Sequence, residues 1–157
     1  MNRRFAKEIN VHSNMNYSTE DNKWNSKILD CYYTNHTTDS VNFSMLIENR
    51  ILDIEIQIKN IGYPFRPPKV LINIHNYKSL LRNSNLMQKY KTFLKFDKCM
   101  CCNSILCKWS PHYGITHILK EIKSNFLIKY RLKNIIFAKY IMEKYLGFEL
   151  ILLYEFV

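Results

Sequence analysis

The sequence is poor in the two residues that interrupt regular structure. It has three glycines and four prolines among 157 residues, and three of those prolines, Pro64, Pro67 and Pro68, fall within five positions. Proline fixes φ and pushes the residue before it towards an extended conformation. We therefore expect each glycine or proline to mark a specific turn, and residues 64–68 to form a stiff connection.

Long apolar runs are also lacking. No stretch approaches the roughly 20 apolar residues that a membrane-spanning helix needs, and residues 1–10 lack the apolar segment of a secretory signal. The apolar tail 148–157 is short and is interrupted by Glu149 and Glu155. These features predict no membrane partner.

Cysteines are few and unevenly placed. Four of the five fall between positions 99 and 107, which is unlike a disulfide scaffold and fits reduced thiols inside a cell. We expect a cytoplasmic or nuclear protein. The abundance of Asn, Lys, Ile and Tyr is typical of AT-rich genes, as in some large DNA viruses, and a viral protein would then act inside the host cell.

The composition is that of a folded domain with a basic surface. Apolar residues make up 47% of the chain, enough for a real core in one domain of 157 residues. The net charge is +10, but the cations are spread from Arg3 to Lys133, and no RNA-binding or zinc-finger motif accompanies them. We expect a solvated basic surface and no nucleic-acid partner.

Alternating apolar and polar residues predict four strands. They lie at 27–34, 42–47, 51–58 and 69–75, and the clearest places Leu52, Ile54, Ile56 and Ile58 on one face. Val70, Ile72 and Ile74 share a face in the last of them. A period of two with one wet face is typical of an antiparallel meander.

Helical spacing appears at both ends of the chain. Residues 2–10 predict a short helix that buries Phe5 and Ile9, followed by a polar loop at 12–26. A helix is expected from about Ile115 to Phe126, and another from about Leu132 to a stop at Gly147. Residues 77–98 read less clearly and form a divergent insertion with at most a short, uncapped helix.

The expected architecture is therefore a single α+β domain spanning residues 1–157. It has an N-terminal helix, a four-stranded antiparallel meander sheet, an irregular cysteine-bearing segment, C-terminal helices and the tail 148–157.

Two motifs occur one after the other in the sequence. Residues 63–70 spell YPFRPPKV between two predicted strands, and Cys101 is followed eight residues later by Trp109-Ser110-Pro111 and a helix. Together they resemble the ubiquitin-conjugating enzyme (UBC) family, whose members carry a YPFxPPKV loop, a cysteine segment and a WSP turn before a helix. The resemblance covers nearly the whole chain and implies the UBC-like fold.

The resemblance also implies a function and its partners. A cysteine would accept ubiquitin or a ubiquitin-like modifier as a thioester from an activating enzyme, and would pass it to a lysine or to a ubiquitin ligase, with no cofactor. Gapless alignment makes Cys101 the nucleophile, whereas matching Ile105 and Leu106 to the family's Ile-Leu pair selects Cys102. A thiolate is the nucleophile in such chemistry, and its tetrahedral intermediate needs a hydrogen-bond donor.

The chain departs from the family where that donor should be. Members carry His-Pro-Asn shortly before the cysteine, and the nearest equivalent here is His75-Asn76, which reaches the site only if residues 77–98 leave and return. Position 112 is His where the family has Ala. The resemblance implies a partner surface made of Phe65, Ser110, Pro111, Arg3, Arg4 and Lys7.

Two alternatives remain. A zinc site would use Cys99, Cys101, Cys102 and Cys107, but structural zinc sites prefer C-x₂-C pairs from separate loops, so we expect no metal. A catalytically inactive UBC-like module that binds ubiquitin or a ligase is the other alternative, and the missing His-Pro-Asn favours it.

Overall fold

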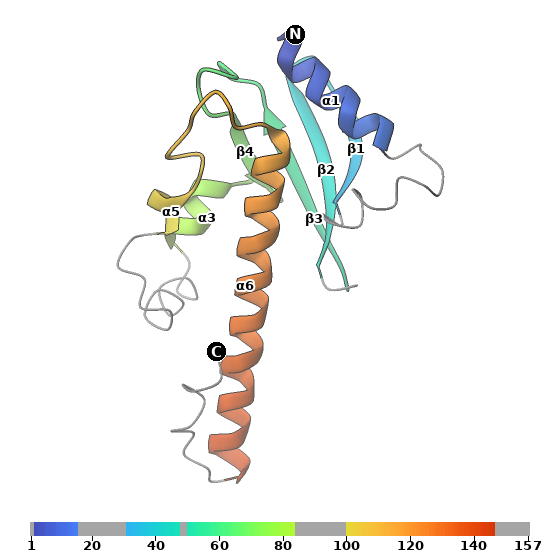
Figure 1. Cartoon of the computed structure of the whole chain (residues 1–157). Coiled ribbons are helices and arrows are strands. Elements are labelled where there is room, and N and C mark those ends of the chain that lie inside the picture. The colour runs from blue at the N-terminus through green and yellow to red at the C-terminus, as the bar shows by residue number, and fades with distance from the viewer. Residues whose placement is uncertain (1, 16–30, 48–49, 84–99, 147–157) are drawn as a thin grey trace.

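A computed structural model describes residues 2–15, 31–47, 50–83 and 100–146. The chain has an α+β architecture, in which an N-terminal helix precedes a five-stranded antiparallel sheet and a long C-terminal helix follows it (Figure 1). The predicted α+β class is confirmed, and the strand and helix numbers differ from those predicted.

The sheet is a meander in which every strand pairs with its neighbours in sequence. The strands are β1 Cys31–His36, β2 Ser40–Ile47, β3 Arg50–Lys59, β4 Lys69–Ile72 and β5 His75–Asn76. Val41, Phe43 and Met45 of β2 pair with Ile58, Ile56 and Ile54 of β3, and all six side chains are buried. The alternation in the sequence therefore predicted the inner face of the central strands. Residues 27–30 and the side chain of Leu52 lie outside the described residues.

The fourth strand is shorter than the alternation predicts. It ends at Ile72, because Asn73 and Ile74 adopt φ values of 45° and 67° and turn the chain into β5. Ile74 is consequently 85% exposed, whereas the pattern placed it beside Val70 in the core. The Asn73 side chain accepts a hydrogen bond from the Glu55 backbone N–H, which fixes the turn against β3. The sheet thus has five strands instead of four.

The first helix, α1, spans Arg3–Met15 and is longer than predicted. Phe5 and Ile9 are buried as expected. The helix continues through residues 12–15, which the sequence assigned to a loop, and there His12 contacts the ring of Phe43 and the hydroxyl of Thr116. These contacts give the last turns of α1 a packed face that their polar sequence did not predict. Residues 16–26 lie outside the described residues.

The predicted insertion begins with helix α3, Tyr77–Asn83. The Asn76 side chain accepts a hydrogen bond from the Lys78 backbone N–H at 3.0 Å, the usual N-cap interaction. The sequence therefore does cap this helix, and Asn76 is the residue that does it. Residues 84–98 lie outside the described residues.

The C-terminal part of the described chain is one helix, where the sequence predicted two. Helix α6 runs without a break from Ile115 to Ile141, and a π-helical turn, Met142–Leu146, follows it. No glycine or proline interrupts residues 115–141, which is why the helix continues. The expected stop at Gly147 and the tail 148–157 lie outside the described residues. Among the described helices, none is both long and apolar enough to cross a membrane.

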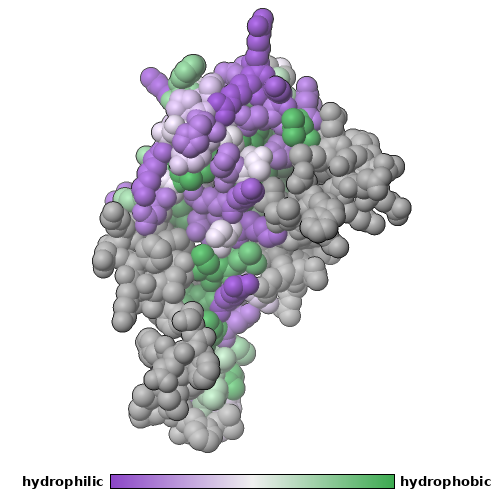
Figure 2. Space-filling model, viewed as in Figure 1, coloured by the Kyte–Doolittle hydropathy of each residue, from purple (hydrophilic) through white to green (hydrophobic). Residues whose placement is uncertain are grey.

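The core joins the sheet to α1 and α6. Ile115, Ile118, Leu119 and Ile122 of α6 are buried together with Phe5 and Ile9 of α1 against the inner face of β2 and β3. Figure 2 shows hydrophilic side chains over the end of the molecule that holds the start of α1, and apolar side chains further down along α6. The C-terminal half of α6 includes the exposed Phe137 and Tyr140, and the π-helical turn after it includes the exposed Tyr145.

Candidate functional site

The proline loop and the Trp-Ser-Pro turn are joined directly. The indole N–H of Trp109 donates a hydrogen bond to the Pro64 carbonyl at 2.7 Å. Its ring lies between those of Tyr63 and Tyr113, with centroid distances of 5.9 Å to each. The Tyr63–Pro64 peptide bond is cis. Two segments 45 residues apart in sequence therefore form one surface.

A single carboxylate ties this surface to α1 and α6. Glu8 accepts hydrogen bonds from the Arg4 guanidinium at 2.9 Å, the Tyr63 hydroxyl at 2.5 Å and the Ile115 backbone N–H at 2.8 Å. Burial and the charge of Glu8 raise the pKa of Tyr63, which keeps its hydroxyl a donor. The hydrogen bond to Glu8 likewise raises the pKa of Arg4.

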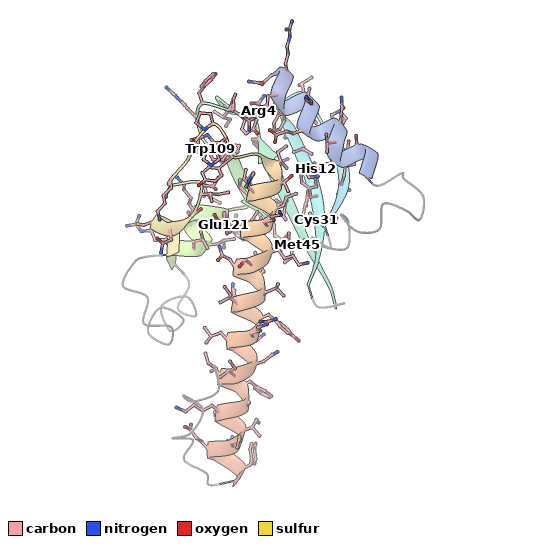
Figure 3. All side chains as sticks on the ribbon, in the orientation of Figure 1. Arg4, His12, Cys31, Met45, Trp109 and Glu121 are labelled. Atoms are coloured by element: carbon pink, nitrogen blue, oxygen red, sulfur yellow. The ribbon has the colours of Figure 1, made fainter. Side chains whose placement is uncertain are left out.

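Arg4 also reaches the turn that follows the tryptophan. Its guanidinium donates to the carbonyl of Pro111 and, at 3.0 Å, to that of Tyr113. Figure 3 shows Arg4 at the start of α1 and Trp109 in the loop beside it. Arg4, which the resemblance implies for the partner surface, thus also links α1 to the turn after Trp109.

The other residues of the predicted partner surface are accessible to different degrees. Phe65 is 82% exposed, and Pro111, Arg3 and Lys7 are also exposed. Ser110 is partly buried, and its hydroxyl lies 2.8 Å from the Nδ1 atom of His112. His112 therefore interacts with Ser110, where the family's alanine could form no hydrogen bond.

The two candidate nucleophiles lie on one short helix, α5, Met100–Asn103. Cys101 is partly buried against the core and is disulfide-bonded. Cys102 is exposed and free, and its sulfur lies 3.8 Å from that of Cys101. The sequence favoured reduced thiols throughout, and Cys101 differs from that expectation, whereas Cys102, Cys107 and Cys31 are free.

Glu121 of α6 fixes the segment that follows the cysteines. Its carboxylate accepts hydrogen bonds from the Ser104 hydroxyl at 2.7 Å and from the Ile105 backbone N–H at 2.6 Å. It also accepts one from the Tyr77 hydroxyl at 3.2 Å. The hydroxyl oxygen of Tyr77 in turn accepts a hydrogen bond from the side-chain amide of Asn125. Burial and the charge of Glu121 raise the pKa of Tyr77, so its hydroxyl stays protonated. The carboxylate links α6 to α3 and to the segment that follows α5.

Asn76 caps the helix that packs beside the cysteines. Helices α3 and α5, which stand before and after residues 84–99 in the sequence, contact each other (Figure 1). The Oδ1 atom of Asn76 is engaged with Lys78, and its amide N–H groups remain as potential donors. Asn76 therefore begins a helix that contacts α5, the helix that carries Cys101 and Cys102.

Sequence reasoning missed Glu8 and Glu121 as organising residues. A signal existed for both, since Glu8 lies between the buried Phe5 and Ile9, and Glu121 lies between the buried Leu119 and Ile122. A carboxylate next to a buried helix face requires hydrogen-bond partners. No pattern in the sequence indicates which partners these are.

No metal centre is evident in the part of the chain that the structure describes. Residues 2–15, 31–47, 50–83 and 100–146 contain no group of three or more His, Cys, Asp or Glu side chains placed to hold a metal ion. Cys99, which the zinc alternative required, lies outside the described residues.

Comparisons with protein-family models, with curated proteins and with solved structures find no match for this chain.

Proposed function

We propose that this protein is a ubiquitin-conjugating enzyme that carries ubiquitin or a ubiquitin-like modifier as a thioester on a cysteine of α5. The observation that carries the proposal is the hydrogen bond from Trp109 to Pro64. It joins the two motifs on which the resemblance to the family rests, and Phe65 and Pro111 are exposed next to that junction.

The proposed chemistry consists of two acyl transfers. A cysteine thiolate attacks the carbonyl of the modifier's C-terminal thioester on the activating enzyme, forms a new C–S bond and releases that enzyme's thiolate. A lysine amine then attacks the new thioester, loses a proton and expels the cysteine thiolate as the isopeptide bond forms. Each step passes through an oxyanion that a hydrogen-bond donor stabilises.

The residues near α5 support this chemistry unequally. The free N–H groups of the Asn76 amide are candidate oxyanion donors, since Asn76 caps α3 and α3 contacts α5. Glu121 orients the backbone that follows the cysteines. Cys101 requires reduction before it can act, whereas Cys102 is already a free, exposed thiol.

Thioester loading tests the proposal. The protein is fully reduced, freed of reductant, and incubated with activating enzyme, ATP and ubiquitin or another modifier. We expect an adduct that reductant removes. Cys101→Ser should abolish it or convert it into a reductant-stable ester, with Cys107→Ser as the matched control that loads normally. Loss of the adduct in Cys102→Ser alone would instead assign the chemistry to Cys102.

A non-catalytic binding module is the second candidate. The disulfide at Cys101 and the engagement of the Asn76 side-chain oxygen in a helix cap favour it. In that case no modifier would form an adduct while a known conjugating enzyme loads in parallel. A ligase or ubiquitin would still bind, and Phe65→Ala would weaken that binding without changing the fold.

A further inference from the structure

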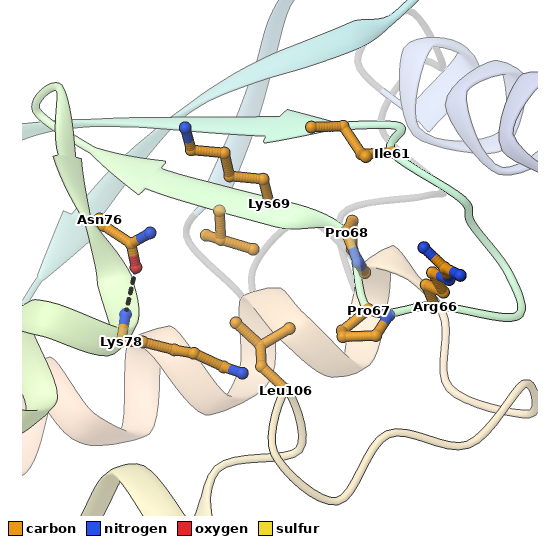
Figure 4. A pocket seen from close by; sticks show the side chains of 9 residues that line it. Ile61, Arg66, Pro67, Pro68, Lys69, Asn76, Lys78 and Leu106 are labelled. Carbon is orange, nitrogen blue, oxygen red and sulfur yellow. Dashed lines mark hydrogen bonds between the residues drawn. The ribbon is translucent and has the colours of Figure 1, made fainter.

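A cavity of about 330 Å³ lies between the proline loop, β4 and the start of α3 (Figure 4). Its apolar lining includes Val70 and Leu106, which are 2% and 4% exposed, together with Pro67 and Pro68. Leu106 belongs to the segment that follows the cysteines. The volume is at the lower end of the range for small-ligand pockets.

The ionisable side chains that line this cavity all carry the same sign of charge. They are Arg66, Lys69 and Lys78, and all three are exposed. Asn76 also lines it, and because its Oδ1 atom accepts from the Lys78 backbone N–H, only the amide N–H groups remain (Figure 4). The side chains of the cavity therefore offer cations and hydrogen-bond donors beside an apolar wall.

The geometry points to a binding site for a carboxylate carried next to an aliphatic group. The C-terminal residue of a peptide ending in Leu, Ile or Val has this chemistry, and so does an internal Asp or Glu beside such a residue. The carboxylate would face Lys78 and the Asn76 amide, and the aliphatic group would pack on Pro67 and on Ile61, which also lines the cavity and is 59% exposed. A bare inorganic anion would leave the apolar wall uncovered. This site does not depend on thioester chemistry at α5.

Matched small probes test the site directly. N-acetyl-leucine carries the carboxylate and the aliphatic group, and N-acetyl-leucinamide differs only in its missing charge. Backbone amide signals of Val70, Lys78 and Leu106 are followed by NMR during titration of the reduced full chain. We expect saturable shifts with the acid and an affinity for the amide that is lower by about tenfold, as loss of one charge-assisted contact predicts.

A charge reversal at the rim provides the second test. Lys69→Glu combined with Lys78→Glu should abolish saturable binding of N-acetyl-leucine. Lys120→Glu combined with Lys133→Glu makes the same charge change on exposed positions of α6 and should leave binding unchanged. The fold of each variant is checked from its amide spectrum.

Three results would overturn the site: equal affinity for acid and amide, no saturable shift at the three reporters, or unchanged binding in the rim variant. Two further peptides identify the source of the carboxylate. One ends in a free leucine, and the other has blocked ends and an internal Glu-Leu pair. Tighter binding of the first assigns the site to a chain terminus, and tighter binding of the second assigns it to an internal acidic residue.

Discussion

The Glu8 carboxylate on α1 accepts the backbone N–H of Ile115 at 2.8 Å, at the first residue of α6. One acidic side chain thereby satisfies the first backbone N–H of a 27-residue helix, at the end where a negative charge is stabilising. Gly114, the residue before Ile115, leaves room for this contact, since a Cβ at position 114 would lie 2.8 Å from an oxygen of Glu8.

Replacing Gly114 by Ala should therefore destabilise the protein through Glu8. The backbone of Gly114, with φ of −127°, accepts an L-residue, so the cost arises from displacing the carboxylate. We expect a loss of about 1–3 kcal/mol in the free energy of unfolding, the usual cost of breaking hydrogen bonds to a charged group. Denaturant unfolding followed by circular dichroism measures it.

A double-mutant cycle separates this cause from a general backbone effect. In a Glu8→Ala background the added methyl group has no carboxylate to displace, so Gly114→Ala should cost much less there. Additive losses in the double mutant would show that the two positions act independently.

Glu121 allows a similar prediction for the cysteine segment. The Glu121 carboxylate accepts from the Ser104 hydroxyl, the Ile105 N–H and the Tyr77 hydroxyl. Glu121→Gln removes its negative charge and replaces one of its two acceptor oxygens by an amide. We expect about 1–3 kcal/mol of destabilisation, and faster hydrogen exchange at the Ile105 amide. Glu143→Gln is the matched control, because Glu143 is exposed and has only a 3.5 Å ion pair with Lys139. That variant should lose under about 1 kcal/mol. Equal losses in the two would contradict the role given to Glu121.

The sequence predicted the central strands of the sheet better than the end of β4. Alternation identified the buried faces of β2 and β3, because a half-buried antiparallel strand leaves that pattern whatever its partners are. It failed at Ile74, where a β-branched residue adopts a positive φ that its type disfavours. No glycine marks this turn, so the alternating pattern of the sequence runs on through it.

The helices were likewise predictable only in part. The buried face of α6 was predictable from the spacing of Ile115, Ile118 and Ile122. Its continuation to Ile141 is consistent with the absence of glycine and proline from residues 115–141. The hydrogen bonds of Glu8 and Glu121 join segments 55, 107 and 16 residues apart, and no local pattern encodes such pairings.

The cysteines should differ sharply in reactivity. Burial raises the pKa of Cys31 to about 12, so roughly a thousandfold less thiolate is present than for an ordinary thiol of pKa 9.0. Exposed Cys102 and Cys107 should label quickly with maleimide under non-reducing conditions, and Cys31 should label only after unfolding. Cys101 should become reactive only after reduction, because it is disulfide-bonded. Peptide mass spectrometry locates each adduct, and rapid labelling of Cys31 in the folded protein would contradict its burial.

The stability of the protein should also fall in mild acid through His12. Burial lowers the pKa of this imidazole, which lies against Phe43 and within 3.2 Å of the Thr116 hydroxyl, while the charge of Glu8 opposes the shift. The unfolded chain, with an ordinary histidine pKa of 6.5, then binds a proton more readily than the folded one. The contribution of neutral His12 is therefore complete above about pH 6.5 and is lost as the pH falls below it.

Unfolding free energies measured across this range test the effect of His12. His12→Gln removes the titrating group, so its stability should vary less with pH than that of the wild-type protein. His75→Gln replaces an exposed histidine in β5 and should follow the wild-type profile. Because other groups titrate in acid as well, only the difference between the two variants isolates His12. Identical pH profiles for all three proteins would contradict the assignment.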